Sequence, residues 1–443
     1  MVIIAREAKL KPGYKLTEVG VIPEEWDLKT FDEVMTGFTS GATPSRKYPE
    51  FYKGDIRWIT SGELNYNIIM DTIERVSVEA ISKTNLKLIP KGTFLIAITG
   101  MEAEGTRGSC GIVGAEATTN QHCMALYPTK ELSTNYLFHY YVFRGKSLAL
   151  QYCQGTKQQD YTGKIVKLLP ILLPPTIKEQ QAIAAALSDV DALLTSLDRL
   201  IAKKRDIKQA TMQQLLTGKV RLPGFSRSLK PIHKHTEVGI IPEDWKVTKL
   251  GAVADVKTGP FGSTLHEKDY VNDGTPIITV EHLSEQGVIY ENLPMVSDID
   301  RKRLNAYSLL KGDIVFSRVG SVDRNSLIKE EENGWLFSGR LLRIRSKTSE
   351  VDSSFLSYYF HQEPTKQRIR SVAVGQTMAS LNTQILKNID ITFPPIKAEQ
   401  AAIATVLTDM DTEIVALEQK REKTRALKQG MMQELLTGRI RLV

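Results

Sequence analysis

The stretch Pro174-Pro-Thr-Ile-Lys-Glu-Gln-Gln-Ala-Ile-Ala184 opens a segment that the chain contains twice. It returns as Pro394-Pro-Ile-Lys-Ala-Glu-Gln-Ala-Ala-Ile-Ala404, and the alignment runs without a gap to Leu222 and Leu442, with roughly half of the positions identical. Both copies begin with a Pro-Pro and a Glu-Gln pair and end with Leu-Leu-Thr-Gly. This regularity indicates one structural unit present in two copies.

The repeat also covers the region before each of these segments. Thr17-Glu-Val-Gly-Val-Ile-Pro-Glu-Glu-Trp26 recurs as Thr236-Glu-Val-Gly-Ile-Ile-Pro-Glu-Asp-Trp245. Between such framing points the copies differ, as residues 41–54 and 259–270 show. We interpret a shared frame with different inserts as two equivalent bodies with different binding preferences. Drift of surface loops after an old duplication is the alternative.

Composition limits the class of protein. The 443 residues exceed one ordinary core and predict two or more globular domains. Apolar residues at 42% and charged residues at 25% are typical of a soluble folded chain. No segment approaches the ~20 apolar residues of a membrane helix. The first ten residues are too charged for a secretory signal, so we expect a cytoplasmic protein without membrane contact.

Cysteine usage and charge add two further limits. Cys110, Cys123 and Cys153 show no spacing typical of a metal site, which fits a reduced compartment and argues against structural zinc. The formal net charge of +7 and the pI of about 9.0 permit DNA binding through phosphate neutralisation. Many proteins without a nucleic-acid role are equally basic, so charge alone decides little.

Each copy reads as a mixed body followed by a long helix. Strands are predicted at 93–98, 313–317 and 341–345, and helices at 136–149 and 354–371, which together indicate an α+β body. The chain divides into an N-terminal segment that completes the frame (1–22), a first body (23–173), a long helix (174–222), a linker (223–241), a second body (242–393) and a second long helix (394–443).

Both long segments carry apolar residues that step by four and three, which predicts a heptad seam. The seam residues are Ile183, Leu187, Val190, Leu194, Leu197 and Ile201 in the first helix, and Ile403, Leu407, Met410, Ile414 and Leu417 in the second. About 40 helical residues would span about 60 Å. We expect the two seams to pair with each other; packing of each helix on its own body alone is the alternative.

Connectivity predicts the direction of this pairing. Domain termini usually lie close together, so the second body should return the chain near the end of the first helix. A parallel pair would instead force the linker to cross about 60 Å. We therefore predict an α+β fold with two bodies at opposite ends of an antiparallel two-helix coiled coil, related by a pseudo-two-fold axis. Such a molecule suits two separated half-sites on a duplex, where one turn is about 34 Å.

The sequence shows no catalytic constellation. Neither Pro-Pro pair is followed by the aromatic residue of an adenine-methyltransferase site, and Gly145-Lys-Ser147 lacks the upstream glycine of a phosphate loop. Asp189 and Asp191 are two residues apart and would point to different faces of a helix. The seven histidines show no metal-ligand spacing. We expect no catalysis, no metal and no cofactor in this chain. The alternatives are an unrecognised enzyme site or a scaffold that binds only proteins.

The order of these motifs resembles the specificity subunits of type I restriction–modification systems. The resemblance lies in the repeated Pro-Pro-x(3)-Glu-Gln-x-Ala-Ile-Ala helices, their Leu-Leu-Thr-Gly ends, and body segments such as Trp58-Ile-Thr-Ser-Gly-Glu-Leu64 and Phe316-Ser-Arg-Val-Gly-Ser321. It covers nearly the whole chain. The resemblance implies that each body is a target-recognition domain for one half of a bipartite, asymmetric DNA sequence.

The resemblance also implies a role for the helices and a set of partners. The helices would set the gap between the half-sites and dock two modification subunits. Those partners would carry the S-adenosylmethionine chemistry on adenine, and restriction subunits would carry the ATP- and Mg-dependent translocation and cleavage. This chain would bind double-stranded DNA and catalyse nothing itself.

Candidate DNA-contacting residues follow from the side chains that read base edges and phosphates from rigid loops. In the first body they are Thr43, Ser45, Arg46, Lys47, Tyr48, Lys53, Ser61, Glu63, Arg107, Lys157, Gln158, Gln159 and Tyr161. In the second body they are Ser263, Thr264, His266, Lys268, Glu281, His282, Arg318, Ser321 and Arg324. For each of them, the alternative is an ordinary solvated loop residue or a turn hydrogen bond.

Overall fold

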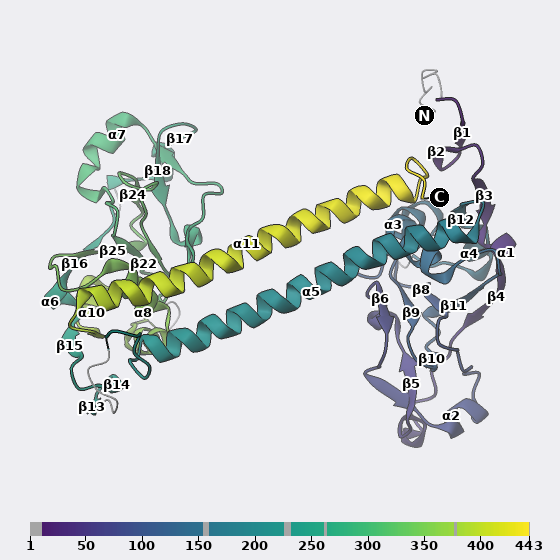
Figure 1. The fold of residues 1–443 in the computed structure, drawn as a ribbon, viewed down its shortest axis with the longest axis horizontal. Helices are drawn as coiled ribbons and strands as arrows, with labels where there is room; N and C mark the ends of the chain where they lie inside the picture. Colours follow the sequence, from purple (N-terminus) through teal and green to yellow (C-terminus); the bar gives the residue numbers. More distant parts are fainter. Residues whose placement is uncertain (1–10, 154–158, 226–231, 261–263, 376–378, 443) are drawn as a thin grey trace. The chain divides into compact units, whose positions relative to one another are not determined.

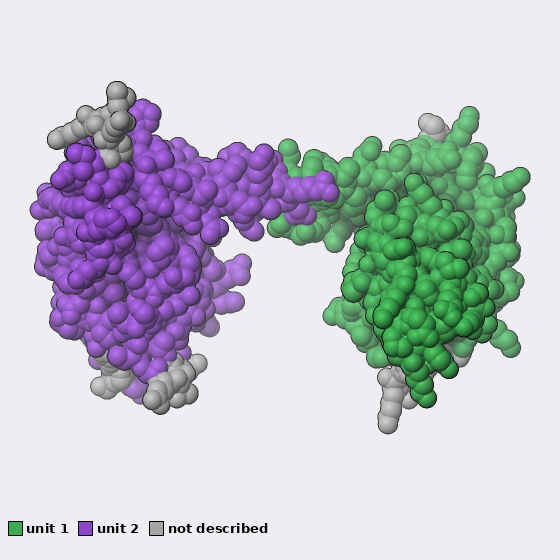
Figure 2. Space-filling model, turned by 90° about the horizontal axis from the view of Figure 1, so that it is seen from below, with its two compact units in different colours: residues 1–197, 420–443 green, residues 198–419 purple. Residues whose placement is uncertain are grey.

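The structure is a computed structural model that describes residues 11–153, 159–225, 232–260, 264–375 and 379–442. The chain forms two compact units, which Figure 2 shows in different colours. Unit 1 comprises residues 1–197 and 420–443, and unit 2 comprises residues 198–419. The boundary divides both long helices, so each unit contains one body and half of each helix.

A five-stranded mixed sheet lies at the centre of unit 1 (Figure 1). Its strands, in spatial order, are β4 (Met35–Ser40), β11 (Cys123–Pro128), β8 (Phe94–Ala97), β9 (Cys110–Val113) and β6 (Asn67–Ile69). Strand β8 is buried throughout because an apolar run follows the turn at Gly92, whose φ of +86° favours glycine. Helix α3 (Thr134–Tyr152) packs against β8 and β9 and closes the core with Tyr136, Tyr140 and Tyr141.

A smaller lobe with its own core belongs to the same unit, and we call it lobe 1. It contains the sheet β10 (Ala117–Thr119), β5 (Ile56–Ile59) and β7 (Glu74–Val76), the helix α2 (Val78–Lys83) and the 3-10 turn η1 (Pro49–Tyr52). Its core consists of Phe51, Trp58, Val76, Ala80 and Leu86. Residues 41–54, the first of the differing inserts, therefore belong to a lobe that is stabilised separately from the central sheet.

The remaining elements of this body frame its start and its end. Hairpin β1–β2 precedes the body, and strand β3 pairs antiparallel with β12, the last strand before the long helix. These elements and their short neighbours are β1 (Tyr14–Thr17), β2 (Gly20–Pro23), β3 (Asp27–Thr30), α1 (Phe31–Val34), η2 (Ser61–Glu63), α4 (Gly163–Leu168) and β12 (Pro170–Leu173).

Unit 2 repeats this plan. Its central sheet has the order β16 (Ala254–Thr258), β25 (Leu341–Ser346), β22 (Ile314–Ser317) and β23 (Asn325–Leu327). Its small lobe, lobe 2, has the sheet β17 (Tyr270–Val271), β21 (Met295–Val296), β18 (Thr275–Ile278) and β24 (Leu336–Phe337), with helix α7 (Asp298–Arg303). In both lobes the strand after the insert, β5 or β18, has one parallel and one antiparallel neighbour.

The other elements of unit 2 also match their counterparts. Hairpin β13–β14 and the pair β15–β26 correspond to β1–β2 and β3–β12. The full set is β13 (His233–Thr236), β14 (Gly239–Pro242), β15 (Lys246–Lys249), α6 (Leu250–Val253), η4 (Glu267–Asp269), η5 (Val280–His282), β19 (Leu283–Ser284), β20 (Gly287–Val288), η6 (Asn305–Tyr307), α8 (Ser353–His361), α9 (Glu363–Val372), α10 (Thr383–Lys387) and β26 (Asp390–Phe393).

Helices α5 (Ile177–Leu215) and α11 (Lys397–Leu435) have 39 residues each. All the predicted seam residues are buried or half-buried. The first two of each seam, such as Ile183 and Ile403, join the core of the body that precedes their helix. The same two cores also contain the end of the other helix, through Leu435 in unit 1 and Leu215 in unit 2. Each body core therefore receives the start of one long helix and the end of the other.

Ion pairs within each unit show that the helices run antiparallel. In unit 2, Lys208 lies 2.6 Å from Asp411 and Lys204 lies 2.6 Å from Glu413, so rising numbers in α5 meet falling numbers in α11. In unit 1, the early residue Asp191 of α5 pairs at 2.6 Å with Lys428, a late residue of α11. Lys208 and Asp411 are about nine-tenths buried, which favours one register, because a shifted register would leave a buried charge without its partner.

The Glu-Gln motif at the start of each long helix has a structural role. Glu179 accepts two hydrogen bonds from the guanidinium of Arg441, and Glu399 accepts two from Arg221. Gln180 accepts from the backbone N–H of Ser133 at 2.9 Å and donates to the carbonyl of Glu131 at 2.8 Å. Each helix start is therefore tied both to the loop before its own body's helix and to the tail after the other long helix.

Glycine ends each long helix for a steric reason. Gly218 and Gly438 have φ of +69° and +71°. A Cβ at Gly438 would lie 2.5 Å from Pro23 and 3.1 Å from Trp26, and a Cβ at Gly218 would meet Pro242 and Trp245 at the same distances. The repeated Leu-Leu-Thr-Gly and Ile-Pro-Glu-x-Trp motifs are therefore two sides of one packing contact.

Most of the predicted elements are present, and one prediction needs correction. The predicted helix at 354–371 is broken at Gln362 into α8 and α9, because Pro364 begins a new helix better than it continues one. The predicted linker 223–241 contains β13 and most of β14, since Gly239 supplies the φ of +117° that the turn requires. The segment boundaries predicted from the sequence stay predictions.

We expect Arg221→Met to lower the free energy of unfolding by about 3–5 kcal/mol, because the fully buried Glu399 carboxylate would lose its partner. Urea unfolding followed by tryptophan fluorescence measures this change. Arg439→Met is the matched control, since Arg439 is half exposed and pairs loosely with Glu434 at 3.4 Å. In this control variant, the free energy of unfolding should fall by less than about 1 kcal/mol. Equal losses in both variants would contradict the role of the buried pair.

Candidate nucleic-acid interface

Residues 41–54 form a loop on lobe 1 whose two ends are fixed by glycines. A Cβ on Gly41 would lie 2.0 Å from the carbonyl oxygen of Thr119, and a Cβ on Gly54 would lie 2.3 Å from that of Val76. Both distances are far shorter than real contacts allow, so these positions require glycine. Between them, Trp58 Nε1 donates to the carbonyl of Ala42 at 3.1 Å, and the Tyr52 hydroxyl donates to that of Pro44 at 2.6 Å. The loop is held in place along its length.

This loop presents polar and basic side chains to solvent. The structure brings together six residues predicted to contact DNA, all of them exposed: Thr43, Ser45, Arg46, Lys47, Tyr48 and Lys53. Glu50 is the one acidic residue among the fourteen. A fixed loop with three cations and adjacent hydroxyl groups has the chemistry of a DNA-contacting surface.

Arg46 is the most strongly organised of these side chains. Its Nη1 and Nη2 donate to the two carboxylate oxygens of Glu74 at 2.6 and 2.7 Å. Its guanidinium carbon lies 4.0 Å from the centre of the Tyr52 ring and 5.8 Å from that of Trp58. The hydrogen bonds to Glu74 raise the pKa of Arg46, and the same bonds lower the pKa of Glu74. The sequence analysis missed Glu74 and Tyr52, because no local pattern connects Glu74 with an arginine 28 residues earlier.

The loop that begins at Gly259 occupies the same place in unit 2. A Cβ on Gly259 would lie 2.1 Å from the carbonyl oxygen of Ser338, and a Cβ on Gly274 would lie 2.1 Å from that of Val296. The anchors therefore repeat although the sequences between them differ. Of the residues predicted here, His266 and Lys268 are exposed and Thr264 is half-buried. Ser263 lies outside the described residues.

The segments after β5 and β18 hold four predicted residues in a shared capping arrangement. The Glu63 carboxylate accepts from the backbone N–H of Thr60 at 2.8 Å and from that of Ile73 at 2.9 Å. In unit 2, His282 Nδ1 accepts from the N–H of Thr279 at 3.2 Å while Nε2 donates to the carbonyl of Glu291 at 3.1 Å. Through these hydrogen bonds, Glu63 and His282 hold the backbone of their own units.

Exposure separates the four residues further. His282 is 2% exposed, so its predicted DNA contact is wrong: both ring nitrogens are used inside the fold. Ser61 is half-buried and Glu281 is exposed. A hydrogen bond from Thr279 is the main cause of a lowered pKa at Glu281, so this carboxylate stays ionised.

A third predicted group lies where the loop after β8 meets the segment that leads to α4. Arg107 donates from Nε to the carbonyl of Met101 and from Nη2 to that of Glu102, both at 2.9 Å, so its guanidinium closes the loop. The Gln159 backbone N–H donates to the Glu102 carboxylate at 3.0 Å. Tyr161 is 3% exposed within the core, and its predicted DNA contact is therefore wrong. Lys157 and Gln158 lie outside the described residues.

The turn between β22 and β23 carries the last three predicted residues. Arg318 is half-buried and donates from Nη1 to the carbonyl of Gly339 at 3.3 Å. Arg324 is half-buried and donates to the carbonyl of Leu283. Ser321 is exposed at the turn. Both arginines thus donate hydrogen bonds to the backbone of their own unit, and Ser321 is the most accessible of the three.

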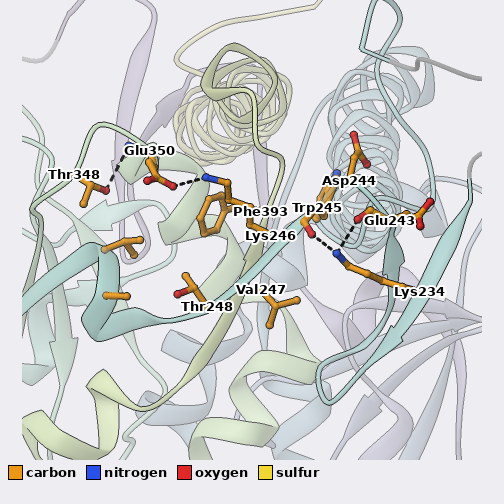
Figure 3. A pocket seen from close by; sticks show the side chains of 12 residues that line it. Lys234, Glu243, Asp244, Trp245, Lys246, Val247, Thr248, Thr348, Glu350 and Phe393 are labelled. Atoms are coloured by element: carbon orange, nitrogen blue, oxygen red, sulfur yellow. Dashed lines mark hydrogen bonds and ion pairs between the residues drawn. The ribbon is translucent and has the colours of Figure 1, made fainter.

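A cavity of about 630 Å³ lies in unit 2 next to β15 (Figure 3). The Lys234 ammonium donates to the carbonyls of Glu243 and Trp245, both at 2.7 Å, and Lys246 pairs with Glu350 at 2.6 Å. The charged groups that line it are largely paired with neighbours in the unit. None of the lining residues belongs to the loop 259–274. The cavity is therefore separate from the candidate interface.

Two further features are absent from the residues that the structure describes. No group of three or more His, Cys, Asp or Glu side chains among them is placed to hold a metal ion. No helix among them has both the length and the apolar character needed to cross a membrane.

Comparisons with known proteins agree on one family. The family model described as the type I restriction modification DNA specificity domain matches residues 23–208 and again residues 242–425. The MjaVIII specificity subunit of a type I restriction enzyme from Methanocaldococcus jannaschii is 25% identical over 430 residues, covering 95% of this chain and 94% of that protein. The putative MjaX specificity subunit from the same organism is 27% identical over 451 residues, covering 100% of both.

Solved structures show the same fold. The crystal structure of the type I restriction-modification S subunit from M. genitalium has a TM-score of 0.58 and 16% identity, and the alignment covers 96% of this chain and 99% of that one. The tandem domains, the paired long helices and the family match define a DNA specificity protein built from two equivalent domains. The chain belongs to the type I restriction–modification specificity subunits, with two tandem DNA specificity domains.

We expect Gly54→Ala to loosen the loop 41–54, because the added methyl group would collide with the Val76 carbonyl and displace the backbone. The free energy of unfolding should fall by about 1–3 kcal/mol, and hydrogen–deuterium exchange should rise across the loop. Gly62→Ala is the matched control from the same body, since a Cβ there meets nothing within 4 Å. Similar exchange in the two variants would show that the loop does not depend on this anchor.

Proposed function

We propose that this specificity subunit reads a bipartite, asymmetric DNA target, with one half-site bound by each body, and that it catalyses nothing itself. The observation that carries the proposal is the pair of anchored loops. Gly41 and Gly54 hold one loop, Gly259 and Gly274 hold the other, and the residues between them differ in sequence and charge. Equivalent placement with different chemistry supports two reading surfaces of the same kind with unlike targets.

The partners follow from the family. Type I specificity subunits work with modification and restriction subunits on DNA. We propose that two modification subunits dock on this chain and carry the S-adenosylmethionine chemistry on adenine, while restriction subunits carry the ATP- and Mg-dependent steps. The pseudo-repeat supports the number two, because each copy offers its own equivalent set of frame residues.

The helices are proposed to set the gap between the half-sites. Both have 39 residues, and the buried pair Lys208–Asp411 and the pair Asp191–Lys428 favour one antiparallel register. A fixed register and a fixed length would give a fixed spacing. A scaffold that binds only proteins is the competing function; it predicts no DNA binding by the assembled complex and no salt dependence.

Exchanging residues 23–173 for the first body of another specificity subunit should change one half of the methylated sequence and leave the other half unaltered. The reason is that each loop is anchored within its own unit. Mapping methylated adenines in a host that expresses the chimera with its modification subunit measures the outcome. The reciprocal exchange of residues 242–393 is the matched control. A change in both halves from either exchange would refute independent reading.

Removing residues 195–201 together with 418–424 should shorten the gap and leave both half-sites unchanged. The deletion takes one heptad from each helix and keeps the flanking pairs Asp191–Lys428 and Lys208–Asp411. Seven residues correspond to about 10 Å of helix, or roughly three base pairs. The same methylation mapping gives the spacing. Duplicating the two heptads should lengthen the gap equally, and an unchanged spacing in both variants would exclude the helices as its determinant.

A further inference from the structure

We propose that Arg46 is a specificity-determining residue that reads a guanine in the half-site bound by unit 1, with Glu74 and Tyr52 as the residues that position it. This inference rests on the proposed function, since it assumes that lobe 1 faces DNA. It goes further by naming one side chain, the base edge that it recognises, and the two neighbours that hold it.

The hydrogen bonds of Arg46 leave a recognition face open. A guanidinium has five N–H donors, and Glu74 takes one from each of Nη1 and Nη2. In the part of the chain that the structure describes, no other residue accepts a hydrogen bond from Arg46. Nε–H and one further N–H on each terminal nitrogen therefore stay available, while the side chain is 59% exposed. The Nε side of the group can form a second bidentate contact.

The side chain is fixed before any DNA arrives. The Tyr52 ring covers one face of the guanidinium at 4.0 Å, and the Tyr52 hydroxyl is itself held by the carbonyl of Pro44 at 2.6 Å. Glu74 lies in β7, which is an antiparallel neighbour of β5; in this sheet the backbone of Arg75, the next residue, lies opposite that of Arg57. Both positioning residues thus lie in regular elements of lobe 1, Tyr52 in η1 and Glu74 in β7. Fixing the arginine in advance reduces the entropy that binding would otherwise cost.

The chemistry of the group favours a base over a phosphate. The planar fork of an arginine matches the N7 and O6 acceptors of guanine in the major groove, which is the commonest specific contact to DNA. Lys47 and Lys53 in the same loop differ in kind: they are exposed, and none of the described residues pairs with either ammonium group. Such exposed, unpaired point charges suit phosphates, which fix position without reading sequence. The loop therefore offers one base reader among backbone contacts.

The test compares Arg46→Ala with Lys53→Ala in the full complex with its modification subunit. The readout is the methylation rate on DNA in which each base of the first half-site is varied one at a time. Arg46→Ala should lose roughly tenfold to a hundredfold on the wild-type target and should accept other bases at a single guanine position. Lys53→Ala should weaken binding to all sequences by a similar factor and should reduce the salt dependence.

Glu74→Ala tests positioning apart from a structural role. Because Glu74 acts through Arg46, the substitution should relax the same base position in the wild-type background and add no further relaxation to Arg46→Ala. Circular dichroism checks that the variants fold, and Glu74→Gln, which keeps one acceptor oxygen, should give an intermediate effect.

The outcomes separate this inference from the proposed function. If Arg46→Ala lowers methylation equally on every sequence, Arg46 contacts phosphate and the base-reading role is wrong. If Arg46→Ala leaves both the methylation rate and the sequence preference unchanged, the pair of Arg46 with Glu74 only stabilises lobe 1, and the inference is again wrong. In both cases a bipartite methylated target of the wild-type complex would still stand. A wild-type complex without such a target would instead overturn the proposed function.

Discussion

A buried carboxylate at the start of each long helix requires an arginine that comes from far along the chain. Glu179 and Glu399 are almost completely buried, and their partners Arg441 and Arg221 lie 262 and 178 residues away. An unpaired charge at either place would cost several kcal/mol, so helix start and tail must assemble together. The same tails carry the glycines that fit against Trp26 and Trp245. Each body is thus completed by the end of the helix that follows the other body.

The frame and the two anchored loops obey different constraints. At Gly41, Gly54, Gly259 and Gly274 a neighbouring carbonyl oxygen occupies the space of a side chain, so the ends of each loop have no freedom of sequence. Between these ends the loops carry exposed polar side chains, such as Arg46 and Lys47 in the first loop and His266 and Lys268 in the second. The loop 41–54 accordingly has three basic residues and one acidic residue, whereas 259–274 has one lysine and three acidic residues. The anchors are sterically fixed, whereas the exposed positions between them can differ in residue type. One fold can therefore carry two different surfaces.

Features that depend on spacing could be predicted from the sequence, and features that depend on distant partners could not. The duplication, the α+β bodies, the apolar seams and the glycine stops at Gly218 and Gly438 are visible as patterns in one dimension. The pairing of Arg46 with Glu74 has no local signal, because it joins a loop to a strand across the lobe. The loss of Tyr161 and His282 from the interface has the same origin: a polar residue type indicates a capability, whereas burial depends on the tertiary fold.

The capping positions show how far the frame itself tolerates chemical change. Glu63 and His282 occupy equivalent places after β5 and β18, and each accepts a hydrogen bond from the backbone N–H of the threonine three residues earlier. A carboxylate and an imidazole nitrogen are both acceptors, so either one satisfies the same backbone group. What the repeat preserves is therefore the hydrogen-bonding requirement rather than the residue. A polar difference between the copies is free of this requirement only where the side chain has no such contact, as at the exposed Lys47 and Lys53.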